Sequence, residues 1–533
     1  MPNFKLDDRE IPFEPGETII RAAQKAGVDI PHYCWHAGLS VAANCRMCLV
    51  EIMPPPGRPA LLLDVLAWDK EKQEYLPQKK PKLVPSCQQA AAEGMVVKSQ
   101  TSPHVDTARA AVQELLLLNH PVDCPICDQA GECRLQDYWL EHAATKKRMR
   151  DEPIHKPKAV VFGPTIVYDA ERCIVCTRCV RVSEELAKDP VLSVRERGNL
   201  NEIVVAPGRK LDHAYTLMTE YVCPVGALTS LDFRFKARVW FLRSTRTVCT
   251  GCATGCNSFS DFDPRNQKVY RYRPRENLAV NKFWMCDDGM LDHRRIHEGR
   301  VLEARVDGEP STLPTALGKA AEILRKASPD ATAVVLSAEH SNEDNFALLS
   351  LAKAFGFSSV YQSGRPAGQG DDILRHPDKN PNTTGIAELG KASGLKNFVE
   401  FVEAIRAGKA QTVIALGSAT PSAGGRAALA DVAQLIAIST HDGAFSEHAR
   451  VVLPASSWAE ADGTFVNAKG MSQESEKAIT PQGASKPAVR LIAELSALSG
   501  KPLSWKKLTE LRAAMAPAAP RSVTTESASL GAE

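Results

Sequence analysis

The stretch Cys173-Ile-Val-Cys-Thr-Arg-Cys179, followed far downstream by Cys223-Pro224, is the most informative part of this chain. Three cysteines at intervals of three wrap one face of a metal cluster and direct backbone amides at its sulfurs, and a remote Cys-Pro closes the cubane. A single zinc ion would leave one ligand of the triplet unused. The pattern predicts that a [4Fe–4S] cluster is bound by Cys173, Cys176, Cys179 and Cys223.

The 533-residue chain contains 15 cysteines, and all of them lie between Cys34 and Cys286. By spacing they form sets of four, three, four and four, and the set of three is preceded by His120. These sixteen ligands are enough for four metal sites with no thiol left over. The N-terminus resembles neither a signal peptide nor a transit peptide. We therefore expect a reducing cytoplasm, where thiols are more often metal ligands than disulfides.

The first set has the spacing Cys34-x10-Cys45-x2-Cys48-x38-Cys87. A structural zinc site usually takes its ligands from two close pairs, whereas here one close pair is joined by two single cysteines. A [2Fe–2S] cluster needs two thiolates for each iron, and plant-type ferredoxins bind it with a related loop whose first gap is shorter. The spacing predicts a [2Fe–2S] cluster, with zinc or ordinary thiols as the alternative.

The second set is His120-x3-Cys124-x2-Cys127-x5-Cys133. A cubane has four irons to ligate, and imidazole nitrogen is a common metal ligand that can replace a missing thiolate. His104 is the poorer candidate because a full predicted helix separates it from Cys124. The alternative for His120 is an ordinary surface histidine. We predict a [4Fe–4S] cluster bound by His120 and the three cysteines.

The fourth set, Cys249-x2-Cys252-x3-Cys256-x29-Cys286, could hold zinc on spacing alone. Because three other sets predict iron–sulfur clusters, we predict a further [4Fe–4S] cluster here.

Composition and missing motifs exclude several classes of function. The chain has 65 basic and 63 acidic residues and a net charge of +2, which gives no electrostatic case for nucleic-acid binding. No apolar run approaches the roughly 18 residues that span a bilayer. The dinucleotide, P-loop and zinc-protease motifs are also missing. We therefore predict no catalytic residue and no organic cofactor site in this chain, which would conduct electrons between partners.

Hydrophobic periodicity predicts a small mixed N-terminal domain and a parallel α/β layer in the C-terminal half. In the first 120 residues we expect a hairpin (4–6 and 11–13), a helix (18–26), a strand (49–53) and a helix (104–118) with an apolar stripe of Ala108, Val112, Leu115 and Leu116. After residue 300 we expect strands at 332–337, 360–361, 412–417 and 436–439 and helices at 342–354 and 426–435. The Ala/Pro/Ser/Thr-rich tail from Ala513 is expected to be disordered.

With these motifs in place, the sequence resembles the family of the G subunit of NADH-quinone oxidoreductase, the large iron–sulfur subunit of bacterial respiratory complex I. The matching stretches are Pro31-His-Tyr-Cys34, Asn44-Cys-Arg-Met-Cys48, Pro85-Ser-Cys87, Asn119 to Asp128 with Gly131 to Gln136, Cys173 to Cys179, and Cys223-Pro-Val-Gly-Ala227. Segments at 450–454 and 460–470 also have the appearance of the family.

The resemblance implies a multidomain α+β and α/β fold. The expected parts are a β-grasp [2Fe–2S] ferredoxin domain (1–98), a [4Fe–4S] domain with one histidine and three cysteine ligands (99–152), a ferredoxin-like [4Fe–4S] domain (153–240), a molybdopterin-oxidoreductase-type [4Fe–4S] domain (241–300), a shortened molybdopterin-oxidoreductase-like α/β domain (301–510) and a disordered tail (511–533). The family has electrons pass from NADH through FMN on a partner subunit to the [2Fe–2S] cluster, and then through two cubanes toward quinone. The fourth cluster is generally off that route.

The resemblance further implies peripheral placement on the cytoplasmic side of the bacterial inner membrane, among the peripheral-arm subunits of a proton-translocating complex. We expect no molybdopterin, because the 247 residues after Cys286 are few for a pterin pocket and contain no cysteine to ligate molybdenum. The alternative function is an electron-transfer subunit of a soluble NAD-linked hydrogenase or formate dehydrogenase. A zinc-stabilised scaffold without a redox role is a third interpretation.

Overall fold

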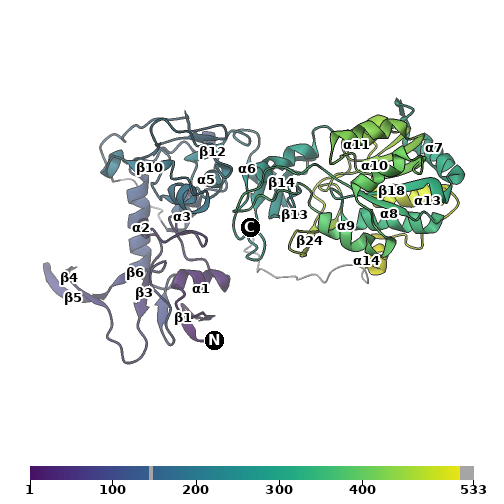
Figure 1. Ribbon diagram of the computed structural model, residues 1–533. Helices are drawn as coiled ribbons and strands as arrows, with labels where there is room; N and C mark the ends of the chain where they lie inside the picture. Colours follow the sequence, from purple (N-terminus) through teal and green to yellow (C-terminus); the bar gives the residue numbers. More distant parts are fainter. Residues whose placement is uncertain (143–147, 516–533) are drawn as a thin grey trace. The chain divides into compact units, whose positions relative to one another are not determined.

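The computed structural model describes residues 1–142 and 148–515. They form two compact units, which meet in sequence between Val239 and Trp240 and are called unit 1 and unit 2 (Figure 1). Among the described residues, the longest apolar helices fall short of what a membrane crossing requires.

The N-terminal domain of unit 1 is a β-grasp fold built on a five-stranded sheet (Figure 1). β1 pairs antiparallel with β2 and parallel with β7, so the first hairpin and the last strand lie side by side. Helix α1 (Ile19–Lys25) buries four of its residues against this sheet. The predicted hairpin, helix and strand are confirmed. The sheet order is β2 (Arg9–Pro12), β1 (Asn3–Leu6), β7 (Val96–Lys98), β3 (Leu49–Met53) and β6 (Leu83–Pro85).

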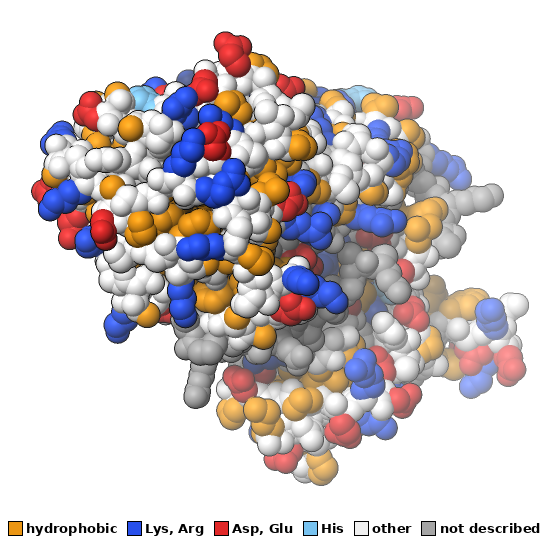
Figure 2. Space-filling view, turned by 90° about the vertical axis from the view of Figure 1, so that its right-hand side faces the viewer, with side chains coloured by type: hydrophobic (Ala, Val, Ile, Leu, Met, Phe, Trp, Pro, Cys, Tyr) orange, Lys and Arg blue, Asp and Glu red, His pale blue; other side chains and the backbone are white. Residues whose placement is uncertain are grey.

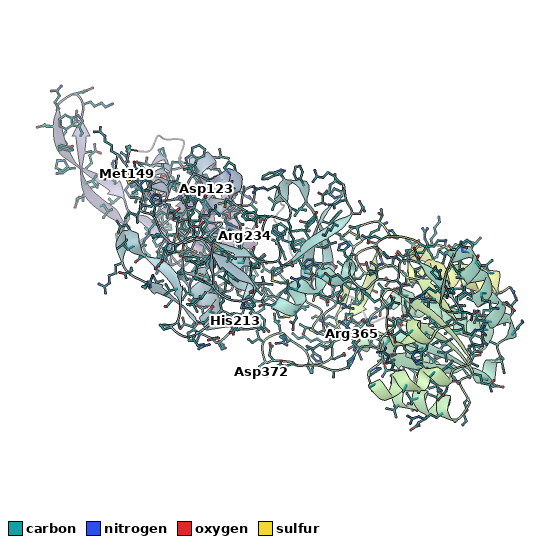
Figure 3. All side chains as sticks on the ribbon, turned by 90° about the horizontal axis from the view of Figure 1, so that it is seen from above. Asp123, Met149, His213, Arg234, Arg365 and Asp372 are labelled. Atoms are coloured by element: carbon teal, nitrogen blue, oxygen red, sulfur yellow. The ribbon has the colours of Figure 1, made fainter. Side chains whose placement is uncertain are left out.

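A long hairpin interrupts this domain between β3 and β6. Its strands β4 (Leu62–Asp69) and β5 (Glu74–Pro81) pair only with each other in a two-stranded sheet, and they extend away from the rest of unit 1 in both ribbon views (Figures 1 and 3). The periodicity analysis did not predict this hairpin.

Helix α2 (Pro103–Leu117) is present as predicted, but its buried face is not the predicted apolar stripe. Val105, Arg109 and Gln113 are buried, whereas Leu115 is 67% exposed. Arg109 donates to the carbonyl oxygen of Ser99 at 3.0 Å, and the Gln113 amide lies 2.5 Å from the Tyr33 hydroxyl. Hydrogen bonds from Arg109 and Gln113 therefore orient this helix, together with the apolar burial of Val105.

The rest of unit 1 consists of short elements separated by cysteine-bearing turns. β9 pairs with both β8 and β12, and β10 pairs with β11. The elements are a turn at Cys124–Ile126, α3 (Arg134–His142), β8 (Val160–Val161), β9 (Ile166–Tyr168), α4 (Arg178–Arg181), a π turn (Val182–Leu186), β10 (Leu192–Arg195), β11 (Glu202–Val205), α5 (Leu217–Tyr221) and β12 (Leu228–Ser230).

Unit 2 opens with a three-stranded antiparallel sheet, β13 (Arg243–Val248), β14 (Asn257–Asp263) and β15 (Lys268–Pro274). A seven-stranded sheet follows, in which β19, β18, β20, β21 and β22 are parallel, and this confirms the predicted α/β layer. Antiparallel β16 (Ala304–Val306) and β17 (Glu309–Ser311) extend its other edge. The parallel strands are β18 (Thr332–Ser337), β19 (Ser359–Ser363), β20 (Thr412–Leu416), β21 (Gln434–Ser439) and β22 (Val451–Pro454).

Helices cover the large sheet and give unit 2 its hydrophobic core (Figure 1). They are α7 (Leu313–Lys326), α8 (Asn342–Phe355), α9 (Thr383–Gly390), α10 (Phe398–Arg406), α11 (Ala423–Ala428), α12 (Ala444–His448), α13 (Ala488–Leu498) and α14 (Leu508–Met515). Short α6 (Asp287–Leu291) and the hairpin β23 (Gly463–Val466) with β24 (Ser472–Ser475) complete the unit. Lysines and arginines alternate with acidic and apolar side chains over the face shown in Figure 2.

Two predictions about unit 2 are wrong in detail. The helix expected at 426–435 ends at Ala428, because the chain must return to the buried strand β21 by Gln434. The tail expected to be disordered begins too early, because α14 continues to Met515 and buries Leu511 and Met515. The remainder of that predicted tail, residues 516–533, lies outside the described residues.

Candidate metal centres

The first cysteine set lies on two loops of the β-grasp domain. Cys48 precedes β3 and Cys87 follows β6, and these neighbouring strands are antiparallel. The four thiols form two hydrogen-bonded pairs, Cys34 with Cys45 and Cys48 with Cys87. The hydrogen bond from Cys34 lowers the pKa of Cys45 to about 5, against the opposing effect of burial. One pair of sulfurs for each iron is what a [2Fe–2S] cluster requires.

The backbone around Cys45 is shaped to donate hydrogen bonds to sulfur. Ala43 and Arg46 have φ of 49° and 63°, in the left-handed region that residues other than glycine seldom occupy. Backbone amides of Tyr33, Cys34 and Met47 donate to the Cys45 sulfur. Such amides stabilise the thiolate form and tune a bound cluster. The strained loop conformation therefore has a chemical use at this site.

All four members of the third set line one cavity. Its remaining walls are largely apolar side chains of the surrounding loops and strands: Ile174, Ile203, Val225, Ala227 and Leu228. The triplet loop again has left-handed residues, Val175 with φ of 51° and Thr177 with φ of 60°. The Val175 amide lies 3.3 Å from the Cys173 sulfur. Burial raises the pKa of Cys173 to about 11, so deprotonation here needs a cation such as cluster iron.

Tyr168 also lines this cavity, and it contacts Cys173, one of the predicted cluster ligands. Its hydroxyl accepts a hydrogen bond from the Ile203 amide at 3.0 Å and is hydrogen-bonded to the Cys173 sulfur. Because the hydroxyl proton is not used by Ile203, it is free to point at the sulfur.

The second set lies between α2 and α3. Cys127 and Cys133 are buried, and the backbone amides of Leu135 and Gln136 at the start of α3 donate to the Cys133 sulfur. The Cys124 and Cys127 thiols are neighbours across one helical turn. Burial raises the pKa of Cys133 to about 11.

His120 fits a ligand role in this set. Burial lowers the pKa of His120 to about 4, so the ring is neutral at physiological pH, and its buried Nδ1 has no hydrogen-bond partner within the described structure. The His104 Nδ1 is also without one, but His104 lies in the first turn of α2, about 20 Å along the helix from His120. Asp123 and Arg172 act electrostatically on both His120 and Cys127, which places those two side chains in one neighbourhood.

Two buried arginines join the first set to the third. Arg181 donates to the carbonyl oxygen of Cys34 at 2.6 Å and to that of Cys176 at 3.3 Å. Arg178 donates to the carbonyl oxygens of Trp35 and Val222, which adjoin Cys34 and Cys223. Neither guanidinium has a carboxylate partner among the described residues. Buried cations of this kind suit anionic clusters bound by thiolates on both sides.

The third set is in turn packed against the second. Arg172, which precedes Cys173, holds Asp123 with two hydrogen bonds, of 2.6 and 3.2 Å. A Cβ atom on Gly226 would lie 2.4 Å from the Cys127 sulfur, so only glycine permits this approach. The third set therefore contacts both the first and the second.

The fourth set belongs to unit 2 and lines a cavity of about 360 Å³. The amides of Gly251 and Gly289 lie 3.4 and 3.3 Å from the sulfurs of Cys249 and Cys286. A Cβ atom on Gly289 would lie 3.1 Å from the Cys249 sulfur. The segment 364–382 covers this site, since Asp378 accepts from the Ala253 amide and Leu374 accepts from Thr254. All four cysteines therefore face one lined space.

Among the described residues, no three His, Cys, Asp or Glu side chains converge closely enough to hold a single metal ion. A zinc ion needs four donors about 2.0–2.3 Å from one point, whereas a cluster spreads its thiolates over several irons.

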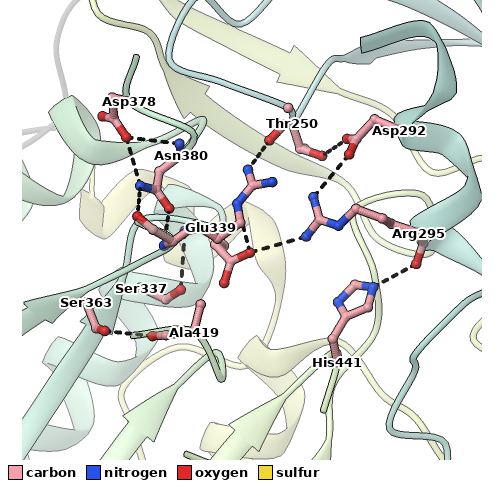
Figure 4. A network of polar contacts seen from close by, with 12 residues as sticks. Thr250, Asp292, Arg295, Ser337, Glu339, Ser363, Asp378, Asn380, Ala419 and His441 are labelled. Atoms are coloured by element: carbon pink, nitrogen blue, oxygen red, sulfur yellow. Dashed lines mark hydrogen bonds and ion pairs between the residues drawn. The ribbon is translucent and has the colours of Figure 1, made fainter. Parts of the chain in front are cut away.

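Another pocket of unit 2 lies where β18, β20, β21 and β22 end, the edge at which open α/β sheets bind ligands. Its contents are an internal network shown in Figure 4: Arg295 contacts Asp292 at 3.1 Å and Glu339 at 3.2 Å, and Arg365 contacts the same Glu339 at 3.2 Å. Thr250 donates to Asp292 at 2.6 Å, which ties the network to the loop after Cys249.

The fold family of the C-terminal domain implies a molybdopterin, but these residues do not fit one. The enclosed space is about 40 Å³, room for a few water molecules, whereas cofactor sites are roughly 300–1,000 Å³. The charged side chains that would bind its phosphates are paired with one another.

Sequence reasoning did not single out Arg172, Arg178, Arg181, Tyr168 or Gly226. Arginines inside and next to the cysteine triplet were the available signal, because a cation between cluster ligands is unusual unless the ligands carry negative charge. Tyr168 and Gly226 carry no such signal, since their partners are distant in sequence.

Comparison with protein families matches four stretches of the chain. Residues 2–102 match a 2Fe-2S iron-sulfur cluster binding domain, 109–148 the iron-sulfur binding region of NADH-ubiquinone oxidoreductase-G, 163–229 the ferredoxin-like domain of NADH-quinone oxidoreductase subunit 3, and 317–498 the molybdopterin oxidoreductase family. These matches confirm the predicted fold class. The chain therefore contains domains of the 2Fe-2S and 4Fe-4S binding kinds.

Individual relatives agree with these matches. The G subunit of NADH-quinone oxidoreductase from Streptomyces coelicolor is 35% identical over 355 residues, covering 65% of this chain and 39% of the relative. NADH-quinone oxidoreductase subunit 3 of Thermus thermophilus is 34% identical over 388 residues, covering 69% and 48%. The chain thus spans less than half the length of these relatives. An NAD+-reducing [NiFe]-hydrogenase structure aligns at 29% identity with a TM-score of 0.36, covering 45% of this chain and 91% of that one.

Proposed function

Because the chain belongs to the family of the G subunit of NADH-quinone oxidoreductase, we propose that it is an iron–sulfur electron-transfer subunit of NADH:quinone oxidoreductase, complex I. Electrons from NADH reach it through FMN on a partner subunit and leave toward quinone, and the complex couples this transfer to proton translocation. The chain would be peripheral on the cytoplasmic side of the bacterial inner membrane, in contact with the flavin/NADH-binding subunit and other peripheral-arm subunits.

One [2Fe–2S] and three [4Fe–4S] clusters would supply the electron-transfer chemistry. The ligands that we propose are Cys34, Cys45, Cys48 and Cys87 for the [2Fe–2S] cluster, and His120, Cys124, Cys127 and Cys133, then Cys173, Cys176, Cys179 and Cys223, then Cys249, Cys252, Cys256 and Cys286 for the three [4Fe–4S] clusters. The protein's own contribution is to donate amide and hydroxyl hydrogens to the sulfurs and to bury them from water.

The observation that carries this proposal is the continuous packing of three cysteine sets in unit 1. Arg181 spans the carbonyls of Cys34 and Cys176, and Gly226 brings the loop of Cys223 against Cys127. A relay needs such adjacency, whereas independent structural sites do not. The soluble hydrogenase or formate dehydrogenase subunit remains the alternative, and co-purification distinguishes the two because their partner subunits differ.

The test begins with the complex purified anaerobically under gentle conditions. We expect about fourteen irons per chain, from one two-iron and three four-iron clusters. Near-stoichiometric zinc with little iron would contradict the proposal.

Two matched cysteine variants then separate a relay site from a structural one. Cys176→Ala should stop NADH-to-quinone transfer while NADH oxidation by an artificial acceptor at the partner's flavin continues. Cys252→Ala should reduce assembly but leave near-normal turnover per assembled flavin, because the pocket beside the fourth set is filled by its own ion pairs. Loss of turnover in fully assembled Cys252→Ala complex would overturn the off-path assignment.

A further inference from the structure

The β4–β5 hairpin concentrates exposed apolar side chains. Leu66, Trp68 and Tyr75 are 68%, 51% and 64% exposed. Leu61, Leu62 and Leu63 at the base of the hairpin are also exposed. Contiguous exposed apolar surface of this kind marks an interaction site more often than chance.

Three cross-strand apolar pairs of the hairpin lie on one face, whereas Leu63 lies on the other. Trp68 lies opposite Tyr75, Leu66 opposite Pro77 and Leu62 opposite Pro81 in the antiparallel register. Because side chains two residues apart point to the same side of a strand, these three pairs share a face with the charged pair Asp64 and Lys79, which lies between Leu62 and Leu66. The rings of Trp68 and Tyr75 contact edge to face, with centroids 5.1 Å apart. We call this set the hairpin face.

The hairpin has no cover within the described part of the chain. Its strands pair only with each other, and it stands away from the sheet into which it is inserted (Figure 3). A two-stranded hairpin by itself is at best marginally stable in water. An eight-pair ladder with an apolar face is therefore stabilised most simply by burial against something else.

The charges on the hairpin indicate what covers it. The turn carries Asp69, Glu71 and Glu74 beside Lys70 and Lys72, so its leading end has no basic cluster of the kind that binds anionic lipid. The base carries a basic group, Arg58, Lys79, Lys80 and Lys82, with Asp64 as the nearby acid.

The edge of β5 is also unsuited to accept a further strand. Pro77 and Pro81 lack the N–H that a neighbouring strand would need. An occupant would therefore not extend the sheet at β5.

We propose that the hairpin face docks into an apolar groove, bordered by carboxylates, on another subunit of the same complex. This inference rests on the proposed function for the existence of that complex. The apolar pairs would supply the buried centre of the interface and the basic base its polar rim.

The test uses the whole complex reconstituted from purified chain and a subcomplex that lacks it. L66S with W68S should weaken assembly by about tenfold or more, because large buried apolar anchors dominate interfaces. V399S is the matched control, since Val399 is 66% exposed on α10 of unit 2, and it should leave assembly unchanged. Iron content and circular dichroism should match the unaltered chain in both variants.

A second variant keeps the proposal testable if the first variant misfolds. K80E with K82E reverses charge at the base without touching the apolar pairs or the Asp64–Lys79 pair, and it should weaken assembly most at low salt. Unaltered assembly of both hairpin variants would overturn the docking proposal.

Two further outcomes are informative. If the unaltered chain binds vesicles of one-third anionic lipid through Trp68 and its variants still assemble, a lipid surface is the occupant and the proposal is wrong. If the unaltered chain from its native source is found with no other subunit, the proposed function itself fails, which is a result distinct from a failure of the hairpin variants.

Discussion

In unit 2, strands β18 and β20 are buried along their whole length, and the 14-residue helices α7 and α8 pack near them. In residues 118–142 and 148–239 of unit 1, strands β8 to β12 have two to four residues each and the polypeptide runs mostly as loops. Eleven of the 15 cysteines belong to unit 1 and four to unit 2. The comparison teaches that apolar burial specifies the fold of unit 2, whereas metal ligation would specify the fold of much of unit 1.

The largest effect that tests this comparison should come from removing iron. Cluster binding supplies folding free energy, so loops that bind metal become less ordered when the metal is removed. After anaerobic chelation, amide hydrogen exchange in residues 160–230 should accelerate strongly, while β18, β20 and α8 keep their protection. Equal protection of both regions with and without iron would contradict the comparison.

The reverse test removes apolar contacts from unit 2. Leu351 is fully buried on α8, and Leu351→Ala should lower the free energy of unfolding of unit 2 by about 2–5 kcal/mol. Iron content of unit 1 should not change. Leu498→Ala, at a side chain that is 52% exposed, is the control and should cost less than about 0.5 kcal/mol. Chemical denaturation followed by circular dichroism gives both values.

A smaller effect is expected where two sets meet in unit 1. Gly226→Ala places a methyl group 2.4 Å from the Cys127 sulfur, and overpacking of this kind costs about 1–3 kcal/mol. We expect loss of the second cluster's electron paramagnetic resonance signal with the [2Fe–2S] signal retained. Gly318→Ala, where no atom lies within 4 Å of the new Cβ, should leave both signals intact. An unperturbed second cluster in Gly226→Ala would show that the loop moves freely there.

The smallest effect should follow from Tyr168→Phe. The variant loses one O–H···S hydrogen bond to Cys173, and such bonds are worth about 0.5–1.5 kcal/mol. Because the bond favours the more negative reduced cluster, its loss should lower the reduction potential of the third cluster by a few tens of millivolts. Redox titration would show this with the other potentials unchanged. A raised or constant potential would mean that the hydroxyl points away from the sulfur.

Sequence reasoning predicted regular elements well where burial is one-sided or complete. β3, β18 and α8 were found within a residue or two, because their apolar periods are undisturbed. The stripe on α2 was wrong because Arg109 and Gln113 are buried by hydrogen bonds that no hydrophobic pattern records. The β4–β5 hairpin was missed because its apolar residues are exposed. A hairpin that buries neither face does not show the alternation of apolar and polar residues that predicts a half-buried strand.

The grouping of the cysteines could be proposed from sequence because ligand spacing is a local property. The contacts between the sets could not. The third set contacts the first through Arg181 and the second through Arg172 and Gly226, and each of these acts on a residue more than 40 positions away in sequence. The four ligand sets remain a proposal that the iron analysis tests.

The polar face of α2 has a consequence for how this chain can be divided. The helix follows the β-grasp domain in sequence, yet Arg109 and Gln113 donate to the backbone carbonyl of Leu49 and to the hydroxyl of Tyr33 inside that domain. A gene fragment that stops at residue 98 therefore removes a buried wall next to Cys34 and leaves donors and acceptors open to water. Any exchange of the first domain between related proteins must therefore include α2. The segment that has to be exchanged is longer than the folded domain itself.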